Sequence, residues 1–313
     1  MKICILYGGT SSERDVSLNT GDSIYEAICN EYEITMHDFN GNYSVLYENV
    51  KDVDLVFNAL HGGDGEDGTV QKYLESKKVK FTGSSSLASK KSMDKNLSKL
   101  LCVKHNIPTP IWFMIDDVKK SDENNLVDRI KKEHKGDVKK FYNHNIYDCV
   151  IKPNNEGSSI GITIIKNFYE NLHLFKEELF CNSSTMIEKY IDGRELTVSV
   201  LDNEVLPIVE IIPSGEYYDY NCKYTKYQSE YVVPAEIDEK TQELLSAYSL
   251  KIHKLIGCGS YSRIDFRLSE DNEVYFLELN TLPGFTDTSL FPKSAKAAGL
   301  EYKDLIKKII EIT

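Results

Sequence analysis

Asp265, Glu278 and Asn280 carry the oxygen atoms that a hard metal ion prefers, and they lie on two predicted strands that can pair. Residues 262–268 and 274–280 each alternate polar and apolar side chains, and a short polar turn separates them. A two-residue turn would place Asp265 opposite Glu278 with Cβ atoms about 5 Å apart, where two carboxylates repel unless a cation lies between them. Two carboxylates and an amide suit Mg²⁺ whose coordination is completed by water and phosphate oxygens.

The other face of this predicted hairpin is apolar, which fixes its register. A slip of one residue would turn the whole apolar set toward solvent. That set comprises Ile264, Phe266, Leu268, Tyr275, Leu277 and Leu279. For this pattern alone, an exposed sheet face with incidental charges is the alternative interpretation, and the rest of the sequence decides between the two.

A glycine- and serine-rich segment that begins with a lysine, KPNNEGSSIG at residues 152–161, is typical of a loop that binds phosphate. Glycines let backbone amides approach oxygen atoms, and Lys152 adds positive charge. The segment lacks the order of a Walker A motif and is flanked by two predicted strands, so it predicts a flap between strands. A plain hairpin turn is the alternative. Lys95, near the start of a predicted helix, could reach the same phosphates as Lys152.

The N-terminal part predicts a parallel α/β domain, because strand, glycine-rich turn and helix follow one another twice. Ligands of such sheets bind off the carboxyl ends of the strands, where both glycine-rich turns would lie. The predicted elements are strand 2–7 with helix 16–28, and strand 54–60 with helix 69–76.

The rest of the chain predicts helices mixed with closely spaced strands. A helix over 87–105 has Leu97, Leu100 and Leu101 along one stripe and ends at the prolines that follow. Residues 116–148 are rich in charged and polar side chains and predict a solvated helix and loop. The remaining predicted elements are strands 149–152, 160–165, 186–191, 195–201 and 205–212, a helix between the second and third of these strands, and a helix over 238–256.

Composition argues against several classes of function. The 313 residues carry a net charge of -12, which argues against nucleic acid as a main partner because a phosphate footprint needs a basic stripe. No apolar run is long enough to cross a bilayer, so we expect no membrane association. A strand begins where a signal peptide would lie, and the seven cysteines lack metal-binding spacing, which together predict a cytoplasmic protein with reduced thiols.

Eight runs of residues, in one order and spread over nearly the whole chain, resemble the D-alanine–D-alanine ligases of the ATP-grasp superfamily. Each run is moderately specific, and the eight together are very specific. They are Gly8-Gly9-x-Ser11-x-Glu13-x-x-Val16-Ser17-Leu18; His61-Gly62-x-x-Gly65-Glu66-Asp67-Gly68-x-x-Gln71; Met93-Asp94-Lys95; Lys152-Pro153 through Gly161; Gly193-x-Glu195-Leu196-Thr197-Val198; Tyr218-Asp219-Tyr220-x-x-Lys223-Tyr224; Arg263-x-Asp265-Phe266; and Glu278-x-Asn280-Thr281-x-Pro283-Gly284-x-Thr286-x-x-Ser289-Leu290-x-Pro292.

The resemblance implies the fold: α/β and α+β, a three-domain ATP-grasp fold with a parallel α/β N-terminal domain. Residues 1–94 would form the N-terminal substrate domain, residues 95–187 the central ATP-grasp domain, and residues 188–313 a C-terminal ATP-grasp domain that carries the metal and acceptor site. ATP would bind between the last two domains.

The resemblance also implies which residues bind the nucleotide and its metal. Two Mg²⁺ or Mn²⁺ ions would be held by Asp265, Glu278 and Asn280. The phosphates of ATP would be contacted by Lys95, Lys152, Ser159 and Lys223. The adenine pocket would be lined by Glu188, Lys189 and Ile191, with Glu195 on the ribose.

Further residues are implied for the amino-acid substrates and for catalysis. Glu13 would hold the ammonium group of the first D-alanine, with His61 beside it. The carboxylate of the second D-alanine would be bound by Ser289 and Leu290. The oxyanion would be stabilised by Arg263 and the backbone of Gly284. A hydrogen-bonded set that ties a loop, roughly residues 215–231, over the closed site would consist of Glu13, Ser158 and Tyr224.

The implied activity is ATP-dependent joining of two D-alanines through an acyl phosphate, for peptidoglycan precursor synthesis, by an enzyme with small-molecule substrates that forms a homodimer. The nearest alternative is the same chemistry with D-serine as acceptor. Tyr224 argues against D-lactate, because ligases that use D-lactate replace this tyrosine. A nucleotide-binding protein without catalysis is the alternative of another class, and the intact set of metal-binding and basic residues argues against it.

Two positions depart from the family pattern. Arg14 stands where the family usually has histidine, and Phe285 stands where methionine is usual. Neither residue has one of the roles above. Phe285 is expected to alter the shape of the pocket beside the second D-alanine.

Overall fold

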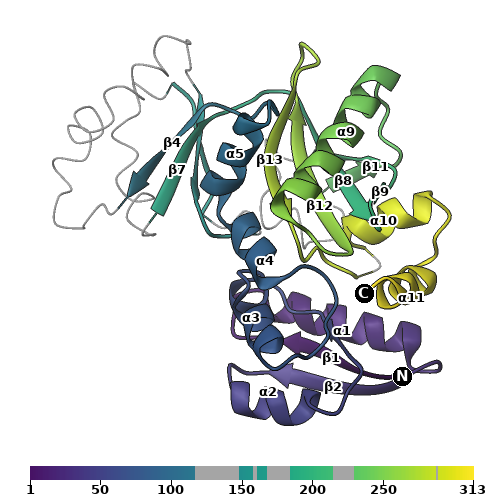
Figure 1. Ribbon diagram of the computed structural model, residues 1–313. Helices are drawn as coiled ribbons and strands as arrows, with labels where there is room; N and C mark the ends of the chain where they lie inside the picture. Colours follow the sequence, from purple (N-terminus) through teal and green to yellow (C-terminus); the bar gives the residue numbers. More distant parts are fainter. Residues whose placement is uncertain (117–147, 158–160, 168–183, 214–228, 287) are drawn as a thin grey trace.

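The computed structural model describes residues 1–116, 148–157, 161–167, 184–213, 229–286 and 288–313, which form three β-sheets and the helices around them (Figure 1). The prediction of a mixed α/β and α+β chain is confirmed. All five cysteines in the described ranges are free thiols. Among the same residues, no helix has both the length and the apolar character needed to cross a membrane.

The N-terminal sheet is parallel, as predicted, with the strand order β2-β1-β3. Its central strand is an apolar run buried on both faces, as expected where helices cover a parallel sheet. The strands are β1 (Lys2–Gly8), β2 (Glu33–Phe39) and β3 (Leu55–Asn58), and the helices are α1 (Arg14–Ile28), α2 (Tyr43–Val50), the 3₁₀ turn η1 (Gly63–Gly65) and α3 (Thr69–Ser76). The sequence pattern did not predict β2 and α2, because both are partly exposed and neither has a continuous apolar run.

Two helices, α4 (Ser86–Met93) and α5 (Lys95–Lys104), replace the single helix predicted over residues 87–105. The break lies at Asp94, whose backbone is extended. Its side chain accepts a hydrogen bond from the Leu97 amide at 3.0 Å and so acts as the N-cap of α5. The break turns the first residue of α5, a lysine, toward the centre of the protein.

The predicted apolar stripe of α5 is wrong for two of its three members. Leu97 and Leu100 are 38% and 51% exposed. The helix instead packs against the C-terminal sheet with a more polar face, and its buried residues are Lys95, Ser98, Lys99 and Cys102. Two lysines on the inner face of a helix need partners, since an unpaired ammonium group is costly to bury.

A second, antiparallel sheet has the strand order β4-β7-β5-β6. Its strands are β4 (Trp112–Asp116), β5 (Cys149–Pro153), β6 (Thr163–Ile165) and β7 (Ser184–Lys189). The loop between β5 and β6 is the glycine- and serine-rich segment, as predicted. Except for its ends, the charged segment 116–148 lies outside the described residues, and so does the helix expected before β7.

The third sheet has six strands in the order β11-β10-β8-β12-β13, with β9 paired to the C-terminal end of β8. Helix α9 covers one of its faces (Figure 1). Its strands are β8 (Arg194–Leu201), β9 (Glu204–Val205), β10 (Val209–Pro213), β11 (Ser229–Val232), β12 (Tyr261–Leu268) and β13 (Val274–Asn280), and its helices are α9 (Glu239–Ile256), α10 (Leu290–Ala297) and α11 (Tyr302–Glu311). The single strand predicted over 205–212 is two short strands, because Pro207 lacks the amide that a continuous ladder needs.

The hairpin of β12 and β13 confirms the predicted pairing of Asp265 with Glu278. Beyond Asp265 the register shifts by one residue, because a bulge leaves Leu277 without an opposite residue. The prediction that Tyr275 and Leu277 face the core is therefore wrong. The buried apolar residues of β13 are Val274, Phe276 and Leu279.

The first and last helices share one core. Side chains of α1, including Ile24 and Ile28, pack with Ile306 and Ile309 of α11 in the same buried cluster as the N-terminal sheet. The C-terminal helices therefore hold the third sheet against the first (Figure 1). The predicted domain limits remain a prediction, and the limit between residues 187 and 188 falls inside β7, so a limit after Lys189 fits the strand better.

Candidate active site

A cleft lies where the loops that follow β1 and β3 meet the hairpin of the third sheet and the start of α5. The predicted residues that line it are Glu13, His61, Lys95, Arg263, Glu278, Asn280, Gly284, Ser289 and Leu290. A second pocket opens between the two antiparallel sheets. The predicted residues that line this pocket are Lys152, Glu188, Lys189, Ile191, Glu195, Arg263, Asp265, Glu278 and Leu290. The cleft and the second pocket share three lining residues, Arg263, Glu278 and Leu290. They therefore form one continuous candidate site.

Basic side chains hold both hairpin carboxylates. Arg263 contacts both oxygens of Asp265, with Nε 3.0 Å from Oδ1 and Nη2 2.9 Å from Oδ2. Thr197 on the neighbouring strand donates to Asp265 Oδ1 at 2.5 Å. Lys95 Nζ lies 3.3 Å from Glu278 Oε2. The repulsion expected between these paired carboxylates is thus offset by two cations of the chain itself.

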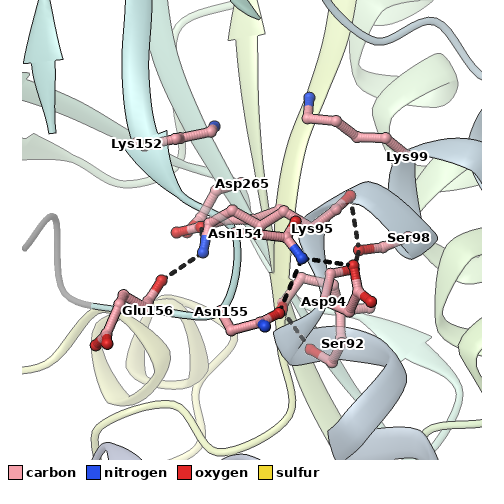
Figure 2. Close-up of polar contacts among 12 residues, drawn as sticks. Ser92, Asp94, Lys95, Ser98, Lys99, Lys152, Asn154, Asn155, Glu156 and Asp265 are labelled. Atoms are coloured by element: carbon pink, nitrogen blue, oxygen red, sulfur yellow. Dashed lines mark hydrogen bonds and ion pairs between the residues drawn. The ribbon is translucent and has the colours of Figure 1, made fainter. Parts of the chain in front are cut away.

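The loop after β5 holds the start of α5 in place (Figure 2). Asn154 donates from Nδ2 to Asp94 Oδ1 at 2.9 Å, and its carbonyl accepts from the Lys95 amide at 3.3 Å. Lys95 Nζ in turn donates to the carbonyl of Glu156. The helix N-terminus and the phosphate-loop candidate are therefore one connected unit, which aims Lys95 at the hairpin.

Lys152 is buried and forms an ion pair at the back of the second pocket. Its Nζ donates to Glu188 Oε1 at 2.5 Å. The other carboxylate oxygen of Glu188 lies 2.9 Å from Nζ of Lys99, a residue that the sequence did not single out. Burial raises the pKa of Glu188, but the two lysines outweigh that effect and hold its pKa below the usual value.

The floor of the second pocket is held by Arg267. Its Nε donates to the carbonyl of Ile191 at 3.0 Å, and its Nη1 lies 3.4 Å from Glu195 Oε2. The guanidinium also lies over the ring of Tyr190, 5.6 Å from its centroid. One arginine thus fixes the segment that the resemblance assigns to adenine and ribose.

Glu13 and His61 lie side by side at the N-terminal wall of the cleft, and both are buried. His61 contacts Thr20 Oγ1 through Nε2 at 3.1 Å, and its Nδ1 lies 3.8 Å from Glu66 Oε1. Gly62 has a positive φ of 64°, and a Cβ there would lie 2.8 Å from Glu13 Oε2. A glycine is required at this point for two reasons, the backbone conformation and the space taken by Glu13.

Gly284 and Ser289 lie at the opposite wall, at the start of α10. A Cβ on Gly284 would lie 2.8 Å from Ser289 Oγ, so the glycine leaves this hydroxyl open to the cleft. Thr286 holds the hydroxyl through its own Oγ1 at 2.7 Å and its amide at 3.2 Å. The serine is thereby oriented where the resemblance expects a carboxylate.

Phe285 does not line the cleft, so the expectation that it shapes the pocket is wrong. Its ring is fully buried and meets the rings of Tyr261 and Phe291 edge to face, with centroids 5.1 and 5.3 Å apart. The other departure, Arg14, forms a bidentate ion pair with Asp38. Its Nη1 lies 2.7 Å from Oδ1 and its Nη2 lies 2.6 Å from Oδ2. Both residues therefore have structural contacts outside the cleft.

Four predicted site residues, Ser158, Ser159, Lys223 and Tyr224, lie outside the described residues, as does most of the loop predicted over 215–231. Conversely, the sequence analysis assigned no role to Thr197, Lys99 or Arg267. Thr197 could have been found from strand pairing, because it lies opposite Asp265 across the ladder. No sequence pattern indicates the burial of Lys99 or the contacts of Arg267, since lysine and arginine are usually exposed.

The donor set at the hairpin fits Mg²⁺. Asp265 and Glu278 supply two carboxylates from directly paired positions, and Asn280 follows on the same strand. The amide oxygen of Asn280 also accepts from the Leu282 backbone at 2.8 Å, which fixes its orientation. In the described ranges, no cluster of three or more His, Cys, Asp or Glu could hold a metal. A site with so few protein ligands suits an ion that keeps water and phosphate oxygens.

Comparison with known proteins agrees with this geometry. The family model described as D-ala D-ala ligase C-terminus matches residues 118–311, and the one described as D-ala D-ala ligase N-terminus matches residues 40–84. The D-alanine–D-alanine ligase of Carboxydothermus hydrogenoformans is 38% identical over 99% of this chain and 97% of its own. The corresponding enzyme of Aquifex aeolicus is also 38% identical, over 99% and 100%.

Solved structures give the same result. The crystal structure of D-alanine–D-alanine ligase from Bacillus anthracis complexed with ATP superimposes with a TM-score of 0.81 at 35% identity, covering 100% of this chain and 96% of that one. The VanG D-Ala:D-Ser ligase from Enterococcus faecalis superimposes with a TM-score of 0.78 at 27% identity, covering 100% and 99%. On sequence matches and superpositions of this extent, the chain belongs to the D-alanine–D-alanine ligase family.

Proposed function

We propose that this chain joins two molecules of D-alanine into D-alanyl-D-alanine at the expense of ATP, as a step in peptidoglycan precursor synthesis. The carboxylate of the first D-alanine attacks the γ-phosphorus of ATP and ADP leaves. The amine of the second D-alanine then attacks the resulting acyl phosphate, and phosphate leaves from a tetrahedral intermediate. The observation that carries the proposal is the continuous site, in which Glu278 faces both pockets and its partner Asp265 faces the second.

The nucleotide would lie in the pocket between the two antiparallel sheets. Lys189 and Ile191 would line the adenine ring together with Glu188, and Glu195 would bind the ribose. Lys95 and Lys152 would neutralise phosphate charge from two sides of the cleft. Asp265, Glu278 and Asn280 would hold two Mg²⁺ ions, which spread the charge of the transferring phosphoryl group when bound.

The amino-acid substrates would lie in the cleft toward the N-terminal sheet. Buried Glu13 would receive the ammonium group of the first D-alanine, with His61 beside it, since a buried carboxylate is a strong partner for a cation. Ser289 and the backbone of Leu290 would bind the carboxylate of the second D-alanine at the start of α10, where amide groups favour anions.

The oxyanion of the tetrahedral intermediate would be stabilised between these subsites. Arg263 reaches both pockets, and the backbone of Gly284 lies on the opposite wall. Donors that are already in place when charge develops contribute most to such a reaction. Outside the described residues, we assign Ser159 and Lys223 to the phosphates, and Ser158 and Tyr224 to a hydrogen-bonded set with Glu13.

Location and assembly are further parts of the proposal. The free cysteines support a cytoplasmic location, because thiols stay reduced there. The resemblance supports a homodimer. Light scattering coupled to gel filtration tests the assembly, and a mass of one chain would reject the dimer.

The decisive test of the function is phosphate release in the presence of ATP, Mg²⁺ and D-alanine, with D-alanine, D-serine or D-lactate as the second substrate. We expect rapid release and a D-alanyl-D-alanine product with D-alanine alone. Preferential formation of the mixed dipeptide would assign the chain to D-serine ligation, the activity named for the VanG neighbour. Nucleotide binding without any product would favour the alternative of a protein without catalysis.

A further inference from the structure

Lys99 is a buried lysine with no part in the mechanism described above. It lies in the middle of α5 with its side chain 0% exposed. Its Nζ donates to Thr109 Oγ1 at 2.7 Å and lies 2.9 Å from Glu188 Oε2. A longer contact of 3.4 Å reaches the carbonyl of Phe276. A buried ammonium group needs a charged partner, and here that partner is Glu188.

Glu188 is shared between two lysines. Its Oε1 accepts from Lys152 at 2.5 Å, while Oε2 faces Lys99. Lys152 and Lys99 come from different elements, β5 and α5 (Figure 2). Their Nζ atoms lie against the two oxygens of Glu188. The Lys99–Glu188–Lys152 cluster therefore contains two ammonium groups and one carboxylate, and it keeps one unit of positive charge.

The protonation states support this charge count at neutral pH. Burial lowers the pKa of Lys99 to about 8, and the carboxylate of Glu188 prevents a larger fall. The pKa of Glu188 lies below its usual value because the effect of the two lysines exceeds that of burial. Lys99 and Lys152 also repel each other, which burial makes stronger.

We propose that Lys99 is a positioning residue for ATP: it takes up one oxygen of Glu188, so that this carboxylate orients Lys152 without neutralising it. Without Lys99, Glu188 and Lys152 would form a neutral buried pair. Lys152 would then offer the phosphates an oriented donor but no net charge. This inference rests on the proposed function, because it requires ATP in the pocket that Lys152 lines.

The test compares ATP with adenosine, which shares the base and sugar but has no phosphate. We expect Lys99→Met to bind ATP at least about tenfold more weakly, which corresponds to about 1.4 kcal/mol. Adenosine should bind the variant and the wild type equally. Both dissociation constants can be measured by ligand-detected NMR titration, which also reports weak binding. Lys104→Met, an exposed lysine at the end of the same helix, is the matched control and should leave both constants unchanged.

A second variant separates charge from folding. Lys99→Gln keeps a group that can bond to Thr109 but has no charge, so it should weaken ATP binding as Lys99→Met does. The double variant Lys99→Met with Glu188→Gln restores one positive charge on Lys152 alone. It should recover ATP affinity relative to Lys99→Met, although not to the full wild-type value, because Lys152 is then less well oriented and the adenine pocket has lost the Glu188 carboxylate. The adenosine dissociation constant of the double variant measures the second effect by itself.

Three results of these binding measurements would overturn the inference about Lys99. Equal ATP affinity of Lys99→Gln and wild type would overturn the inference while leaving the ligase function intact. Equal loss of ATP and adenosine affinity would also overturn it, because it would show that Lys99 only maintains the shape of the pocket. A wild-type protein that binds adenosine but gains nothing from the phosphates would overturn the proposed function as well.

Discussion

Thr197→Val removes a single hydroxyl from the support of the proposed metal site. Thr197 is 0% exposed, and its Oγ1 donates to Asp265 Oδ1 at 2.5 Å. Valine has nearly the same shape, so the substitution leaves no cavity and deletes only the hydrogen bond. Asp265 then keeps Arg263 as its partner but can turn about its side-chain bonds toward that arginine and away from the cleft.

The size of the effect follows from the type of bond. A hydrogen bond to a charged group contributes about 1.5 to 3 kcal/mol. Because Arg263 still contacts both oxygens of Asp265, we expect a loss of about 2 kcal/mol or less in the free energy of unfolding. The loss in metal affinity should be larger in relative terms, about 10- to 100-fold, as is typical when a group that orients a metal ligand is removed.

The assay is the dependence of D-alanine-driven phosphate release on Mg²⁺ concentration, with thermal unfolding alongside. Thr197→Ser retains the hydroxyl and should behave like the wild type. Ser199→Ala, on the same strand, removes a buried hydroxyl that has no hydrogen-bond partner in the described part of the chain and should not change the Mg²⁺ dependence. Equal Mg²⁺ requirements for Thr197→Val and Thr197→Ser would show that the Thr197 hydroxyl does not support the metal site.

Three further predictions test other parts of the site. Glu278→Gln should lose most phosphate release while its far-UV circular dichroism stays unchanged, and near-normal turnover would contradict its role as a metal ligand. Between about pH 8 and pH 10 the native protein should lose the proton of Lys99 that the unfolded chain keeps, so the wild-type unfolding free energy should rise with pH more than that of Lys99→Met. Phe285→Met should lower the unfolding free energy by about 1 to 2 kcal/mol. Its preference between D-alanine and D-serine should not change, and an altered preference would place Phe285 back at the acceptor pocket.

The most predictable features were those set by patterns along the chain. Alternation in the hairpin placed Asp265 opposite Glu278, and the repeated strand, glycine turn and helix placed a parallel sheet at the N-terminus. In both cases a wrong register or a wrong order would expose apolar side chains, so few arrangements fit the sequence. The same reasoning failed after Asp265, because nothing in the alternation shows where a bulge removes one pairing partner.

Helix α5 was less predictable, and the reason is physical. Its leucines suggested a buried apolar stripe, yet Leu97 and Leu100 are on the surface, and Lys95 and Lys99 are inside. A lysine is buried only where a carboxylate from a distant part of the sequence meets it, here Glu278 and Glu188. Helical periodicity contains no information about such partners, so the burial of these lysines could be found only from the folded chain.

The charge of the candidate site is likewise a property of the fold and not of the composition. The chain carries a net charge of -12. Around the second pocket, however, the described ion pairs join four carboxylates to five cations. The carboxylates are those of Asp265, Glu278, Glu188 and Glu195, and the cations are those of Arg263, Lys95, Lys99, Lys152 and Arg267. A chain with a net negative charge thus contains a pocket whose ion pairs retain a positive charge, and low-dielectric walls strengthen that charge for a small anion that enters. Since Lys99 supplies the fifth cation, its removal is expected to take away this local excess without changing a residue that we assign to the phosphates.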